Sequence, residues 1–181
     1  MNLIDCINQH PNNNPIELAN LILEQGFSVN RGMVYILDED TVVKHKRIVT
    51  EDVAQSVQRV NSIVPGFIKE YEIQEDNTVK LFMQRYEGNH PMVFGTIKDK
   101  QHAIQILNEC LNFIEKAKPY IMNDFCSGNI IIGDKIHIMD LDQIFDNDYT
   151  DLSPQEYYRR MQWLKPYVEL QEFIEIWNNK F

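Results

Sequence analysis

The sequence predicts an α+β fold made of two lobes, a sheet-rich lobe followed by a mostly helical one. Three observations predict it: two pairs of strand-like segments surround one amphipathic segment, a polar stretch then interrupts the pattern, and helical periodicity dominates the remainder around one short hairpin. A chain of 181 residues with 44% hydrophobic residues can bury a core in each lobe. We expect an N-terminal lobe at residues 1–85, a linker at 86–91 and a C-terminal lobe at 92–181.

Two helices are predicted in the N-terminal lobe. Asn14 can cap the first helix, Pro15 suits its first turn, and Gly26 can end it. Thr50 can cap the second helix, which stops before Pro65. The second helix presents one apolar stripe, formed by Val53, Val57, Val60 and Val64.

Two β-hairpins are also predicted in this lobe. Residues 33–37 and 41–44 are rich in β-branched and aromatic side chains, and an acidic turn separates them. Residues 67–73 and 79–85 repeat the pattern around a polar turn. Together they supply a small antiparallel sheet.

Helical signals dominate the C-terminal lobe. Apolar residues recur every three or four positions between residues 104 and 114, as on the buried face of a helix. Ser153 and Glu156 have the spacing of a capping box, which predicts a helix beginning there. The buried face of a final helix is predicted at Leu170, Ile174 and Trp177.

The most informative stretch of the C-terminal lobe is residues 123–140, where a short hairpin carries polar residues at both open ends. A two-residue turn at 134–135 would place Asn129 opposite Asp140, whereas a turn at 133–134 would offset them by two residues. In both cases the two side chains meet, with Asp124 one short loop away. Two carboxylates and an amide oxygen are the hard ligands that Mg²⁺ prefers beside phosphate.

Charge and composition narrow the classes of partner. The formal net charge is −10, and the one compact basic cluster lies at residues 44–47, so we expect no nucleic-acid partner. No stretch is apolar over the ~20 residues needed to cross a membrane, and no secretory signal is evident, so we expect a cytoplasmic protein. The three cysteines, Cys6, Cys110 and Cys126, have no metal-ligand spacing.

Residues 123–129 resemble the catalytic loop of the protein-kinase-like superfamily, and the Asp-Leu-Asp of residues 140–142 resembles its metal-binding motif. The superfamily includes protein kinases, aminoglycoside phosphotransferases and lipopolysaccharide core kinases. The resemblance implies a bilobal fold that binds ATP and Mg²⁺. It further implies that Asp124 orients the acceptor hydroxyl and takes its proton, while Asn129 and Asp140 hold the metal.

Weaker matches in the N-terminal lobe extend the resemblance over residues 27–143. Lys44 follows two valines, as the phosphate-binding lysine does in kinases, and its carboxylate partner would be Glu51, Asp52 or no residue at all. Two positions of the glycine-rich loop are in place, and three residues resemble the hinge that binds adenine. The loop positions are Gly32 and Val34; the hinge residues are Gln84, Arg85 and Tyr86.

The sequence also departs from the kinase pattern. Phe27 and Val29 stand where the first two loop glycines would be, and Met122 replaces the catalytic-loop histidine. After Asp142 only about 40 residues follow, a truncation similar to that of minimal kinases among bacterial secreted effectors and phage proteins. A protein serine/threonine kinase is therefore the favoured function. Delivery to a host cell is an alternative to the cytoplasmic location expected above. A sugar or lipopolysaccharide kinase and a pseudokinase acting as a binding module remain alternatives.

Overall fold

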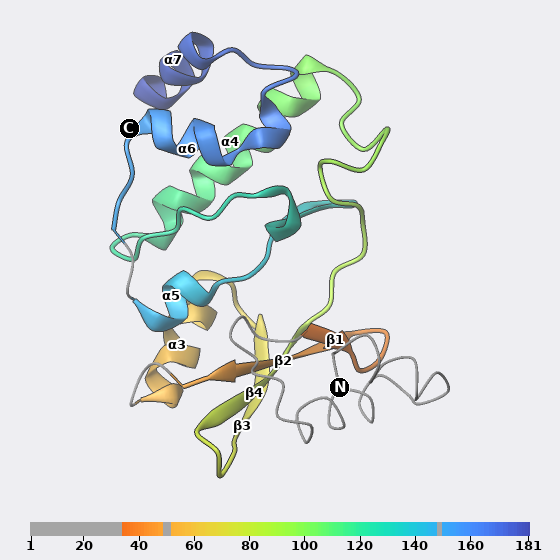
Figure 1. Ribbon diagram of the computed structural model, residues 1–181, viewed down its shortest axis with the longest axis vertical. Helices are drawn as coiled ribbons and strands as arrows, with labels where there is room; N and C mark the ends of the chain where they lie inside the picture. Colours follow the sequence, from red (N-terminus) through yellow and green to blue (C-terminus); the bar gives the residue numbers. More distant parts are fainter. Residues whose placement is uncertain (1–33, 49–51, 148–149) are drawn as a thin grey trace, which may run out of the picture. The chain divides into compact units, whose positions relative to one another are not determined.

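The computed structural model describes residues 34–48, 52–147 and 150–181. The chain divides into two compact units, Met1–Arg85 and Tyr86–Phe181 (Figure 1). The first contains an antiparallel sheet and a helix, and the second contains helices and a small hairpin, so the predicted α+β class is confirmed. The helix expected between Asn14 and Gly26 lies outside the described residues.

The first unit is built on a four-stranded antiparallel sheet with the strand order β1-β2-β4-β3. Both hairpins predicted from strand-forming side chains and polar turns are present, and β4 joins them by pairing with β2. The strands are β1 (Val34–Ile36), β2 (Thr41–Arg47), β3 (Ile68–Ile73) and β4 (Thr78–Gln84).

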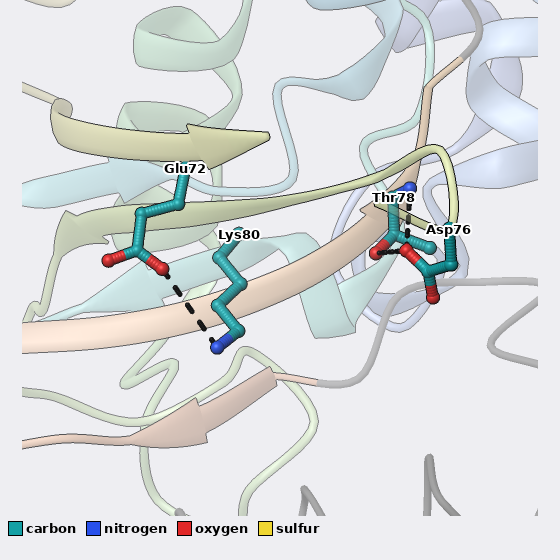
Figure 2. Close-up of polar contacts among 4 residues, drawn as sticks. All are labelled: Glu72, Asp76, Thr78 and Lys80. Carbon is teal, nitrogen blue, oxygen red and sulfur yellow. Dashed lines mark hydrogen bonds and ion pairs between the residues drawn. The ribbon is translucent and has the colours of Figure 1, made fainter. Parts of the chain in front are cut away.

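The turn between β3 and β4 is held by side-chain hydrogen bonds (Figure 2). Thr78 donates its backbone N–H and its hydroxyl to the Asp76 carboxylate at 3.0 and 2.6 Å. These bonds lower the pKa of Asp76, because they favour the charged carboxylate. Glu72 and Lys80 face each other across the strands with 3.9 Å between their charged atoms. The polar turn predicted between these strands is thus held by its own side chains.

Helix α3 (Val53–Ile63) is capped by Asp52 and not by Thr50, so the predicted cap is wrong. The Asp52 carboxylate accepts a hydrogen bond from the backbone N–H of Gln55 at 2.8 Å. Aspartate and threonine are both good N-cap residues. The helix begins after Asp52 because the Asp52 side chain accepts the bond from the Gln55 N–H, which has no partner within the helix. At the other end, both side-chain amide atoms of Asn61 bond the backbone of Ile68, which ties α3 to β3.

In its described residues, 86–147 and 150–181, the second unit contains four α-helices, two short 3₁₀ segments and a two-stranded hairpin (Figure 1). Helix α4 contacts β6, and α6 packs against α7. The elements are α4 (Lys100–Ala117), η1 (Ser127–Asn129), β5 (Ile130–Ile132), β6 (Ile136–Ile138), α5 (Asp142–Asp146), α6 (Pro154–Arg160), η2 (Gln162–Leu164) and α7 (Leu170–Lys180).

The predicted helices of this unit are present, but Ile104 of the predicted α4 face is only half-buried. The buried face of α4 includes Leu107, Leu111 and Ile114, and the capping box of α6 is present. The predicted face of α7 is wrong at Leu170, which begins the helix and is 39% exposed. Phe173 is the fully buried residue of α7 instead. In the described part of the chain, no helix is long and apolar enough to cross a membrane.

Candidate functional site

The hairpin that carries Asn129 and Asp140 has a register that differs from both predicted alternatives. Ile132 pairs with Ile136, which leaves a three-residue turn, and the backbone N–H of Met139 donates to the carbonyl of Asn129 at 2.7 Å. Asn129 therefore lies opposite Met139, and Asp140 is offset from it by one residue. Both predicted registers, opposite and offset by two, are wrong. Asp140 is nevertheless the next residue after Met139, whose backbone N–H is bonded to Asn129.

Asn129 links the hairpin to the loop that contains Asp124. Asn129 is the last residue of η1, which is three residues long, and its side chain is buried. Its side-chain amide nitrogen donates to the backbone carbonyl of Asp124 at 3.1 Å. Because the nitrogen faces Asp124, the amide oxygen is the atom of Asn129 that is suited to contact a cation. One side chain thus connects the Asp124 loop with the strand that leads to Asp140.

Asp140 has a strained backbone. Its φ is +51°, in the left-handed region that side chains other than glycine seldom adopt. This conformation ends β6 and turns the chain into α5 within two residues. Strain of this kind costs of order 1–3 kcal/mol and is concentrated at functional sites. It is a reason, independent of the sequence motif, to examine Asp140 as a functional residue.

Asp124 is the accessible residue in a buried segment. Met122, Asn123 and Phe125 are each at most 2% exposed, whereas Asp124 is half-buried. Its neighbours on both sides are anchored by side chains from the C-terminal part of the unit. Tyr157 donates its hydroxyl to the carbonyl of Met122 at 3.1 Å, and Trp163 donates its indole N–H to the carbonyl of Phe125 at 2.9 Å.

A third anchor reaches the residue directly before Asp124. The side-chain oxygen of the buried Gln143 accepts a hydrogen bond from the backbone N–H of Asn123 at 2.6 Å. The Asn123 side chain is itself held, since it donates to the carbonyl of Thr150 at 2.9 Å and accepts from Arg160 at 3.2 Å. The backbone on both sides of the Asp124 carboxylate is therefore fixed.

Sequence reasoning did not find these anchoring residues. Tyr157, Trp163 and Gln143 lie 35, 38 and 20 positions from the residues that they bind. No motif or spacing connects them to the Asp124 loop. Both aromatic residues are also part of the core, each being 1% exposed.

Cys126 lies beside the candidate site and is not activated. Burial raises the pKa of its thiol, and the nearby carboxylate of Asp124 raises it further because a thiolate there would face a like charge. The backbone N–H groups of Gly128 and Asn129 oppose this with a smaller effect. Cys126 is therefore a protonated neighbour of Asp124 at neutral pH and not a nucleophile.

The residues expected to form the linker pack along β5. Asn89 and Ile132 exchange two backbone hydrogen bonds of 3.0 and 2.9 Å, and the Nδ1 of His90 donates to the carbonyl of Ile130 at 3.0 Å. Two glycines permit this approach. A Cβ added to Gly88 would lie 2.5 Å from the Ile132 carbonyl oxygen, and a Cβ on Gly133 would lie 2.3 Å from that of Glu87.

Tyr86, one of the predicted hinge residues, is engaged by the same hairpin. Its ring stacks on that of His137 in β6, with 3.8 Å between centroids and 15° between planes. Burial raises the pKa of the Tyr86 phenol and lowers the pKa of the His137 imidazole, because burial disfavours the charged form of each.

The other two hinge residues use their backbone donors within the first unit. Gln84 donates its backbone N–H to the carbonyl of Phe67, and Arg85 donates to that of Asp40, both at 2.8 Å. Neither N–H can donate to an adenine ring without losing that bond. Recognition of a base by these two residues would have to use their carbonyl groups.

Two predicted nucleotide-binding residues are brought together in the first unit. Val34 of β1 lies directly opposite Lys44 of β2, and residues opposite each other in an antiparallel pair project from the same face of the sheet. Lys44 is 4% exposed, whereas Val34 is 56% exposed. Gly32 and Glu51 lie outside the described residues. Asp52, the alternative partner for Lys44, caps α3.

The donor set of the second unit fits a magnesium ion that also binds phosphate. Among the residues that the structure describes, no group of three or more His, Cys, Asp or Glu side chains could hold a metal. An all-protein metal cage is thus not found there. Mg²⁺ bound with a nucleotide usually takes only one or two protein carboxylates or amides, with phosphate oxygens and water completing its shell.

Comparison with known proteins does not identify a relative. No protein-family model matches the chain, and neither a curated protein nor a solved structure gave a significant match. The resemblance to kinases therefore rests on the residues described above.

Proposed function

We propose that the protein is an ATP- and Mg²⁺-dependent phosphotransferase that moves the γ-phosphoryl group of ATP to a hydroxyl. The observation that carries the proposal is the chain of contacts from Asp124 through Asn129 to the strand before Asp140, which ends in a strained φ of +51°. Two carboxylates and an amide, one carboxylate being partly accessible on an anchored loop, are residue types that phosphoryl transfer uses.

Each residue has a separate role in the proposed reaction. The Asp124 carboxylate accepts the proton of the acceptor hydroxyl while that oxygen forms a bond to the γ-phosphorus. The bond between the γ-phosphorus and the bridging oxygen breaks, and ADP leaves with the electron pair. Asn129 and Asp140 would hold Mg²⁺, which supplies positive charge to neutralise the phosphate oxygens.

In the same proposal, Lys44 contacts the nucleotide phosphates. The support for this role is the kinase-like position of Lys44 after two valines, in strand β2. Protein serine or threonine is the first acceptor to test, and a sugar or lipopolysaccharide core is the second.

The test is incorporation of ³²P from γ-labelled ATP, with Mg²⁺, into protein extracts and into sugar acceptors. Asp140→Asn should reduce transfer by at least about 100-fold, since it removes the charge that would hold the metal. Asp134→Asn is the matched control, because Asp134 is an exposed aspartate in the turn of the same hairpin. It should retain wild-type activity.

The outcomes are distinct. Transfer that requires Mg²⁺ and is lost only in Asp140→Asn supports the proposal. Nucleotide binding without transfer to any acceptor would replace it with the binding-module alternative. Equal activity of Asp140→Asn and Asp134→Asn would show that Asp140 has no role in the reaction.

A further inference from the structure

We infer that Tyr157 and Trp163 are positioning residues that set the Asp124 carboxylate for phosphoryl transfer by binding the backbone carbonyls on either side of it. The inference rests on the proposed function. It assigns a catalytic contribution to two aromatic residues of the C-terminal part of the chain that do not themselves contact the reacting atoms.

The first argument is the placement of the two hydrogen bonds. Tyr157 binds the carbonyl two residues before Asp124, and Trp163 binds the carbonyl directly after it. A loop held at only one point can still rotate about that point. Two bonds at the two ends of residues 123–125 restrict the backbone of this short segment, and with it the direction of the Asp124 side chain.

The second argument is that the anchors cannot easily move. Both rings are 1% exposed, and the Tyr157 ring packs on that of Trp177 with 4.7 Å between centroids. Burial raises the pKa of the Tyr157 phenol, so the hydroxyl keeps its proton and remains a donor at any pH at which the protein would work. The loop is thus bound to a rigid part of the core.

The third argument is the accessibility of Asp124. A loop anchored only for stability has no need to present a charged residue between buried neighbours. Here the residues on both sides are buried and Asp124 alone in that segment is partly accessible. Catalytic groups need rigid support to within a fraction of an ångström, and a displacement of about 1 Å can cost about 100-fold in rate.

Two neighbouring tyrosines in α6 provide a matched test. Tyr157→Phe removes the hydroxyl that binds Met122, and Tyr158→Phe removes an equivalent hydroxyl that donates to the carbonyl of Val168 at 2.8 Å. Each variant loses one phenol-to-carbonyl bond, worth about 1 kcal/mol of stability. Tyr157→Phe also loses the contact of the same hydroxyl with the Asp151 carboxylate at 3.2 Å. We expect Tyr157→Phe to lower kcat about 10- to 100-fold with the KM for ATP changed less than about threefold. Tyr158→Phe should keep the wild-type kcat.

Trp163→Phe should repeat the kcat effect, which keeps the test valid if one variant folds poorly. A further comparison uses Asp124→Asn. If Tyr157 acts through Asp124, adding Tyr157→Phe to Asp124→Asn should lower the residual rate less than about twofold, because the group to be positioned is already removed. A purely structural role would lower the rate equally in both backgrounds.

The failure of this inference can be distinguished from failure of the proposed function. A wild-type protein that transfers no phosphate from MgATP overturns the function and this inference with it. An active wild type in which Tyr157→Phe and Tyr158→Phe have the same kcat overturns the inference alone. An additive effect of Tyr157→Phe on Asp124→Asn also overturns it.

Discussion

Replacing Gly133 with alanine tests whether the expected linker, residues 86–91, packs on the β5–β6 hairpin. A Cβ at this position would lie 2.3 Å from the carbonyl oxygen of Glu87, where ordinary contact begins at 3.4 Å. Backbone atoms are in the way, so no side-chain rotation can relieve the overlap. The segment carrying Glu87 must move away from β5 by about 1 Å.

The cost follows from the hydrogen bonds that this movement breaks. Asn89 and Ile132 exchange two bonds of 3.0 and 2.9 Å next to the contact, and a further 1 Å places both beyond hydrogen-bond range. At about 0.5–1.5 kcal/mol each, their loss should lower the free energy of unfolding by about 1–3 kcal/mol. Gly128→Ala is the control, since its Cβ would meet nothing nearer than 4.0 Å, and it should leave stability unchanged or slightly raised.

Urea unfolding followed by tryptophan fluorescence measures this effect. Both tryptophans of the chain, Trp163 and Trp177, belong to the second unit and so report on the unit that contains the hairpin. Amide hydrogen exchange at Asn89 and Ile132 should become faster in Gly133→Ala. Stability equal to that of Gly128→Ala, with both amides still protected, would show that the linker does not pack on the hairpin as described.

Two further predictions follow from the pKa shifts. Burial lowers the pKa of His45 and His137 below the ordinary 6.5. As the pH drops through 6.5, the unfolded chain therefore binds protons before the folded protein does, and the stability of the folded protein should fall. NMR titration midpoints above 6.5 for these residues in the folded protein would contradict this. Asp124→Asn should speed the alkylation of Cys126 by iodoacetamide near pH 8, because it removes a charge that raises the pKa of the thiol. Buried Cys110 provides the unreactive control in the same mass spectrum, and an unchanged rate at Cys126 would place Asp124 away from it.

The sheet was predictable from the sequence because its hairpins are local. Residues 34–47 and 68–84 each contain two strand-forming segments around a polar turn, and the partners in each hairpin lie close in the chain. The cap of α3 was not decided by the same reasoning. Thr50 and Asp52 satisfy the same local rule, and only the hydrogen bond to Gln55 distinguishes them.

The geometry of the candidate site was not predictable from the sequence. The run Ile130, Ile131 and Ile132 has no alternation, so no buried face selects the register of β5 against β6. The turn length then had to be guessed, and the observed three-residue turn lies between the two predictions. The anchors Tyr157 and Trp163 depend on packing across many residues of sequence, which local patterns do not record.

The most direct test of the account is where a divalent ion binds when a nucleotide is present. Mn²⁺ can replace Mg²⁺ and broadens the NMR signals of nearby nuclei. On titration of Mn²⁺ with ATP, the side-chain amide of Asn129 and the backbone amide of Asp140 should broaden first, and Asp140→Asn should abolish the effect. Broadening that begins at another acidic segment, such as the turn before β2, would contradict the proposed site.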